Sequence, residues 1–264
     1  MSDFKKLPNH PLVCVLLEVR FSSILNLEKY IPEVQDQVRK KYPLFKKEAE
    51  QILNVTASGV DVNMIDKYIF TGKDKTSSFQ LSPDRIIFLT TEYNRFDDFS
   101  ENCKELLNII SDVISPTLYS RLGLRYSDCV KTINENNEKD LVSLFDTKEV
   151  FFNEKLATLG AKSAHRTETS LQTQYGTLVF RSLLGFTNMT AFDDLMRQNS
   201  VVINPDENPS LRTLLDFDHF WEDNEKQKDF VVEEIIASLS NLHEISRQAF
   251  WNVTSKHARG NVWS

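Results

Sequence analysis

The spacing of its glycines is the sequence feature that most limits what this chain can fold into. The seven glycines stand at positions 59, 72, 123, 160, 176, 185 and 260, and the closest two are Gly176 and Gly185. A dinucleotide-binding turn needs the pattern Gly-x-Gly-x-x-Gly, and a P-loop needs Gly-x-x-x-x-Gly-Lys, because their backbones must approach phosphate closely. Neither pattern occurs, so the Rossmann and P-loop enzyme classes are excluded.

The rest of the composition indicates an ordinary folded protein. The 264 residues are 41% hydrophobic and 26% charged, which is typical of globular chains and allows one large domain or two small ones. The longest apolar run, Leu12 to Leu17, is far shorter than the roughly 20 residues that span a bilayer, and no signal peptide precedes it. We therefore expect a cytoplasmic protein with no membrane segment. The nucleophile elbow Gly-x-Ser-x-Gly of the α/β-hydrolases is also missing.

The N-terminal half predicts a meander of strands with two helices. Leu12 to Phe21 is short and β-branched, so we expect a buried strand at the centre of a sheet. Asn26 is expected to cap an amphipathic helix that Pro43 ends, and residues 97–113 carry the apolar stripe of a second helix. Turn signals separate the other strands, which we expect at 47–57, 65–72, 76–82, 84–92 and 118–132.

The C-terminal half predicts a looser form of the same plan. The polar stretch from Asn134 to Asp140 is expected to be a linker between an N-terminal half at 1–133 and a C-terminal half at 141–264, which share one core. A long helix is expected from Phe230. Strands are expected at about 151–163, 166–175, 177–187, 200–204 and 211–217. We therefore predict an α+β fold, with antiparallel sheets, helices packed on one side and two related halves.

Charge is segregated along the chain, although the net charge is only −7. Residues 206–234 hold ten acids and three bases, whereas five basic residues surround Tyr42 and Phe45. Such segregation favours partners of opposite charge. The candidates for binding an anionic partner are Arg39, Lys40, Lys41, Lys46 and Lys47. The candidates for binding a basic partner are Asp216, Asp218, Glu222 and Asp223.

Two short motifs approach metal-binding patterns without completing them. The run His243-Glu-Ile-Ser-Arg247 begins like the helix of a zinc protease, but Arg247 stands where the second metal-binding His is required. The run Asp216-Phe-Asp-His219 would place two carboxylates on one face of a strand, yet the sequence supplies no third ligand beside them. No metal site and no cofactor are therefore predicted.

One set of residues offers an alternative to a pure binding protein. The set could line one cleft of an enzyme or binder that acts on nucleotides or nucleic acids, provided that Arg125 and His243 face the same concavity. Its members are Arg121, Arg125, Asp128, His243 and Arg247. Direct nucleic-acid binding through the basic residues around Tyr42 is a third reading.

Three stretches give the chain a resemblance to a known family. They are the opening Leu7-Pro-Asn-His-Pro-Leu-Val13 with Glu18-Val-Arg-Phe21, then Gln80-Leu-Ser-Pro-Asp-Arg85 with Tyr93, Phe96 and Arg121-Leu-Gly-Leu-Arg-Tyr126, and last Leu242-His243 with Phe250 and Thr254. In this order and spacing they resemble a family of uncharacterised prokaryotic proteins with a sporadic distribution, over nearly the whole chain. The chain departs from the family at Ser127 and Asp128, where Ile and Asn are typical, and at His10, where a small residue is usual.

The resemblance implies no established activity. Sporadic distribution is typical of genes on mobile elements, so it implies a role in antiviral defence or a toxin–antitoxin system. Together with the missing catalytic motifs, this leads us to expect a non-catalytic cytoplasmic binding protein, such as an antitoxin, a chaperone-like protein or a sensor subunit. The expected partner is the protein product of a neighbouring gene, and a homodimer is the base-rate expectation.

Overall fold

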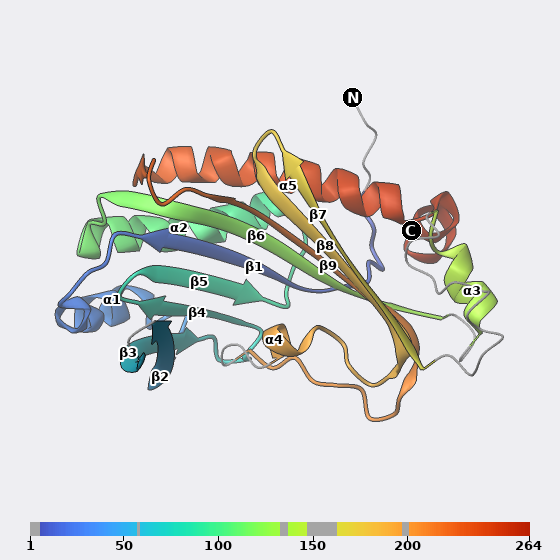
Figure 1. Cartoon of the computed structure of the whole chain (residues 1–264), viewed down its shortest axis with the longest axis horizontal. Coiled ribbons are helices and arrows are strands. Elements are labelled where there is room, and N and C mark those ends of the chain that lie inside the picture. Colours follow the sequence, from blue (N-terminus) through green and yellow to red (C-terminus); the bar gives the residue numbers. More distant parts are fainter. Residues whose placement is uncertain (1–5, 57–58, 133–136, 147–162, 197–200) are drawn as a thin grey trace.

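A single antiparallel sheet organises the chain (Figure 1). In the computed structural model, which describes residues 6–56, 59–132, 137–146, 163–196 and 201–264, ten strands join in this sheet. The order along the sheet is β2-β3-β4-β5-β1-β6-β9-β8-β7, and β10 pairs with β6 beside this path. The long helices pack on one side, so the predicted α+β class is confirmed, with one sheet where several were expected.

The elements have the following bounds. The strands are β1 (Leu12–Phe21), β2 (Leu44–Thr56), β3 (Gly59–Thr71), β4 (Ser77–Ser82), β5 (Arg85–Thr90), β6 (Leu118–Lys131), β7 (Ala164–Thr173), β8 (Gly176–Thr187), β9 (Ser210–Glu222) and β10 (Lys228–Asp229). The α-helices are α1 (Ile31–Val38), α2 (Phe96–Ile114), α3 (Glu138–Ser143), α4 (Asp193–Met196) and α5 (Val232–Val253). A 3-10 turn (Leu27–Tyr30) leads into α1, and a π-helical turn (Ala258–Val262) follows α5.

Strands β1 and β6 form the central pair of the sheet. They are antiparallel, and Leu16 on β1 stands opposite Arg125 on β6. The strands β5, β4, β3 and β2 extend outward from β1, while β9, β8 and β7 extend outward from β6. The prediction of a central strand at residues 12–21 is therefore confirmed. The two halves follow the same order away from the centre, although their common origin remains a prediction.

The helices α2 and α5 lie side by side over one face of the sheet (Figure 1). Leu107 on α2 and Leu239 on α5 are fully buried in the main core. Phenylalanine rings from the strands fill this layer, and Phe70 stacks on Phe79 with their centroids 4.7 Å apart. These contacts follow from amphipathic helix stripes that face strands whose alternate side chains are apolar. Within the described part of the chain, no helix is both long and apolar enough to cross a membrane.

The opposite face of the sheet carries a smaller apolar cluster. Leu195 of α4 and Ile203 pack there against Cys14 and Leu16, which are both buried. The residues 201–204 are not a strand, so that part of the prediction 200–204 is wrong. They form an irregular segment that is held to the turn between β3 and β4. The Val202 amide donates a hydrogen bond to the Lys75 carbonyl of that turn over 3.1 Å.

Two other local predictions need correction. Asn26 donates and accepts no capping hydrogen bond with its side chain, and a 3-10 turn precedes α1 instead. The expected linker contains the start of α3, because the Asn137 side chain caps it by accepting from the Lys139 and Asp140 amides, and Leu141 anchors it in the core. The rest of that stretch, and nearly all of the strand expected at 151–163, lie outside the described residues.

The packing of α5 on the sheet predicts a large cost for truncating its core side chains. We expect Leu239→Ala to lower the free energy of unfolding by about 2–5 kcal/mol, because it leaves a cavity under the helix. The matched change Asn241→Ala, at an exposed position of the same helix, should leave it nearly unchanged. Chemical denaturation of both variants measures the difference, and equal midpoints would contradict this account of the core.

Candidate functional site

The central strand β6 divides the predicted site residues between the two faces of the sheet. Alternate side chains of a strand point to opposite faces. Leu122, Leu124 and Tyr126 point into the core under the helices, whereas Arg121 and Arg125 lie on the other face. Asp128 follows Tyr126 on the helical face and lines a pocket there. The prediction that Arg121 and Arg125 share a cleft with His243 is therefore wrong.

On the face away from the helices, Arg125 is held in a buried ion-pair cluster. Its guanidinium donates to Asp216 over 2.6 Å and to Asp194 of α4 over 2.7 Å. Arg181 on β8 also donates to Asp216, from Nε over 2.7 Å. Asp216 is 0% exposed, so its two guanidinium partners replace the water that a buried carboxylate loses. The cluster ties α4 to the sheet.

A second group of ion pairs surrounds Arg121 on the same face. Arg121 donates to Glu18 over 2.9 Å and to Glu222 over 2.7 Å, and its guanidinium lies 3.8 Å from the ring centroid of Phe220. Arg20 donates to the same two carboxylates. These charges therefore satisfy one another across neighbouring strands.

The predicted acidic cluster is only partly a surface. Glu222 is exposed and Asp223 partly exposed, but Asp216 is fully buried in its ion pairs. Burial raises the pKa of Asp218, and the charges of Arg125 and Arg121 partly offset that effect. The expectation of an exposed face made by all four carboxylates is wrong at Asp216, because β9 lies inside the sheet.

The predicted basic cluster lies at the surface, and its charges are largely paired within the chain. All five side chains are exposed. Four of them form ion pairs: Arg39 with Asp36, Lys41 with Glu105, Lys46 with Glu48, and Lys47 with both Glu28 and Asp66. The cluster therefore presents less free positive charge than its sequence indicates.

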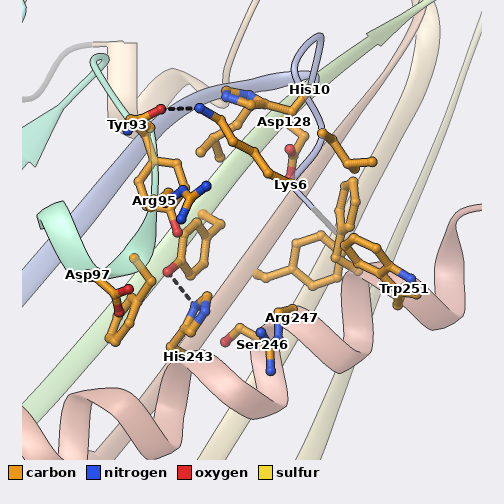
Figure 2. Close-up of a pocket in the computed structure, with 17 residues that line it drawn as sticks. Lys6, His10, Tyr93, Arg95, Asp97, Asp128, His243, Ser246, Arg247 and Trp251 are labelled. Carbon is orange, nitrogen blue, oxygen red and sulfur yellow. Dashed lines mark hydrogen bonds between the residues drawn. The ribbon is translucent and has the colours of Figure 1, made fainter. Parts of the chain in front are cut away.

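A pocket of about 540 Å³ opens on the helical side of the sheet (Figure 2). It is lined by the segment before β1 with the first residue of β1, by the loop before α2 with the first turn of α2, by β6 and β9, and by the C-terminal half of α5. Its polar lining consists of Lys6, His10, Asn94, Arg95, Asp97, Asp128, His243, Ser246 and Arg247. Its aromatic lining consists of Tyr93, Phe96, Tyr126, Phe217, Phe250 and Trp251.

Asp128 is the most unusual polar group of this pocket. The residue is 3% exposed, and its carboxyl makes no hydrogen bond with any of the described residues. Burial raises the pKa of this carboxyl to about 8, with a smaller contribution from the Asp216 carboxylate. At neutral pH the group is therefore mostly a protonated acid, which carries an O–H donor and a carbonyl acceptor.

His10 and Asp128 lie together at one end of the pocket (Figure 2). The β1–β6 register explains this, because Leu12 pairs with Asp128 and His10 precedes Leu12 by two residues. The Nδ1 atom of His10 is buried without a hydrogen-bond partner among the described residues.

Aromatic side chains border the pocket toward α5. The ring of Tyr93 packs edge-on against the ring of Tyr126, with centroids 5.9 Å apart, and the Tyr126 hydroxyl lies 2.8 Å from Nδ1 of His243. The His243 ring stacks flat on Phe96, with centroids 4.0 Å apart. Burial, together with the Arg247 charge, lowers the pKa of His243 to about 4, so the ring is neutral at neutral pH. Arg247 itself forms an ion pair with Glu244.

The structure thus brings together three members of the predicted cleft. Asp128, His243 and Arg247 line one pocket, while Arg121 and Arg125 do not. Sequence reasoning missed Lys6, Arg95 and Trp251 as lining residues. No local pattern could have identified them, because they come from segments far apart in the sequence. In the part of the chain that the structure describes, no three His, Cys, Asp or Glu side chains are grouped to hold a metal ion.

The buried cluster around Asp216 predicts a strong effect on stability. We expect Asp216→Ala to lower the free energy of unfolding by about 3 kcal/mol or more, because two guanidinium groups lose their shared buried carboxylate. The change Lys46→Ala, which breaks an exposed ion pair, should have almost no effect. Urea denaturation of both variants tests this, and a small loss in Asp216→Ala would contradict a structural role for the cluster.

Comparison with known proteins assigns no family and no function to this chain. No model of a protein family matches the chain, and no curated protein matches it. The resemblance to a sporadic prokaryotic family therefore remains a prediction, and the pocket is the basis on which a function is inferred.

Proposed function

We propose that the protein is a non-catalytic binding protein whose pocket takes a small organic anion. The observation that carries this proposal is the buried Asp128 carboxyl, which lines the pocket without a hydrogen bond from any described residue. A buried polar group without a partner costs free energy, so native chains retain few of them. A ligand that bonds to this carboxyl would recover that free energy on binding.

The size and walls of the pocket support a small ligand. A cavity of about 540 Å³ falls within the range of pockets that hold metabolite-sized molecules. Tyr93, Phe250 and Trp251 line it and are only partly buried, so parts of their rings remain open to contact. Hydrophobic and aromatic walls combined with convergent polar groups are typical of such sites.

The charges of the lining favour an anion. Lys6 and Arg95 are exposed cations, and Arg247 adds a cation that is ion-paired with Glu244, whereas Asp97 is the one lining carboxyl that is exposed. Asp128 is mostly neutral below its raised pKa of about 8, so it does not cancel the positive charge. An anionic group would therefore meet an attractive potential at the pocket.

The cellular role that fits this proposal is that of a sensor subunit in a bacterial defence or toxin–antitoxin module. In that role, binding of the ligand would change the affinity of the chain for a partner protein that a neighbouring gene encodes. An antitoxin or chaperone-like role would instead depend on the charged clusters. They support it less, because four of five basic side chains are paired within the chain and Asp216 is buried.

A charge reversal at the pocket tests the proposal. A panel of aromatic carboxylates and phosphates, screened by thermal unfolding, should contain at least one that raises the unfolding temperature. Arg95→Glu should weaken that anion by about fivefold or more, because a unit charge at contact distance is worth about 1 kcal/mol in water. Calorimetric titration gives the affinities.

The matched control is Arg39→Glu, which reverses an equally exposed arginine outside the pocket. It should bind the anion as the wild type does. The proposal fails if no member of the panel stabilises the protein, or if the two variants bind alike.

A further inference from the structure

The polar groups at the Asp128 end of the pocket also constrain the part of the ligand that they contact. Asp128, which is 3% exposed and for which no hydrogen bond to a described residue is found, lies together with His10, whose Nδ1 is buried without a partner among those residues (Figure 2). A protonated carboxyl offers one donor and one acceptor side by side in a plane. Its best partner is therefore a planar group with an acceptor next to a donor.

Nucleobases present that arrangement on their edges. Adenine and cytosine place a ring nitrogen acceptor beside an amino donor, and guanine and uracil place a carbonyl acceptor beside a ring N–H. Proteins that enclose a base read such edges by hydrogen bonds and hold the ring between aromatic side chains. A simple carboxylate or phosphate could accept only one bond from Asp128.

The remaining lining suits the other parts of a nucleotide. The rings of Tyr93, Phe250 and Trp251 border the cavity and can contact the flat face of a base. Lys6, Arg95 and Arg247 supply the cations that a phosphate requires. The first turn of α2 carries the carboxylates of Asp97 and Asp98, which would repel a phosphate at the helix end, so the phosphate would meet the cationic side chains instead.

We propose, resting on the function proposed above, that the ligand is a nucleotide whose base bonds to the carboxyl of Asp128 beside His10 and whose phosphate meets the cationic side chains. The proposal concerns free mononucleotides. It names a substrate class for the pocket and does not require a metal or a reaction.

Calorimetric titration of the full chain with AMP, CMP, GMP and UMP tests this. At least one should bind, and phenyl phosphate, which has a ring and a phosphate without the edge, should bind about tenfold more weakly because two hydrogen bonds are missing. This comparison uses the wild-type protein, so it does not depend on the folding of any variant.

Two substitutions at one position sharpen the test. Asp128→Asn keeps one donor and one acceptor in a neutral group of the same shape, so it should bind the best nucleotide within about threefold of the wild type. Asp128→Leu removes both and should weaken binding by about tenfold or more. Circular dichroism establishes that both variants are folded.

The outcomes separate the two proposals. If phenyl phosphate binds as tightly as the best nucleotide, or if Asp128→Asn binds as weakly as a folded Asp128→Leu, the nucleotide assignment is overturned while the anion pocket stands. If neither the nucleotides nor phenyl phosphate nor the wider anion panel binds, both proposals fail.

Discussion

The alternation of side chains along the central strand β6 is the constraint on which the rest of this structure depends. The strand is buried on both faces, so each polar side chain that it carries must find partners within the chain. On one face Arg121 and Arg125 find carboxylates on neighbouring strands. On the other face Tyr126 bonds to His243, but Asp128 has no partner among the described residues. The Ser127 hydroxyl on the first face also lacks a hydrogen-bond partner among these residues, but Asp128 lines the pocket and Ser127 does not, so the candidate site lies at Asp128.

The burial of Asp128 links the fold to the proposed function. A carboxyl in this position pays the cost of losing water, and it lowers that cost by keeping its proton. The proton in turn makes the group a hydrogen-bond donor, which an ordinary surface aspartate is not. A nucleotide or another organic anion could then approach Asp128 without repulsion. Strained or unsatisfied groups of this kind are typical of functional sites.

Much of the fold could be predicted from the sequence, because local patterns control it. The β-branched run Leu12–Phe21 predicted the central strand β1, and apolar stripes predicted α2 and α5. The irregular segment around Val202 was missed because tertiary contacts hold it. Asn137 was assigned to a linker because the residues around it are polar. Its role as the cap of α3 becomes clear only from the burial of Leu141, which anchors that helix in the core.

The site was less predictable, for a different reason. His243 and Asp128 were predicted to share a cleft and do line one pocket, but Arg125 was grouped with them although it lies three residues from Asp128 and so on the other face. The strand was predicted, whereas the face that each residue takes depends on its partners across the sheet. Lys6 and Trp251 lie near opposite ends of the chain, and only the assembled core brings them to one cavity.

The central claim is that the Asp128 carboxyl in this pocket is protonated at neutral pH. Titration of that carboxyl tests the claim most directly. Carbon-13 NMR of aspartate-labelled protein, with Asp128→Asn to assign the signal, follows the Asp128 carboxyl as the pH is raised. The account predicts an apparent pKa near 8, so that the group is still protonated at pH 7. A carboxyl that is already ionised at about pH 5, close to the ordinary value for aspartate, would contradict it.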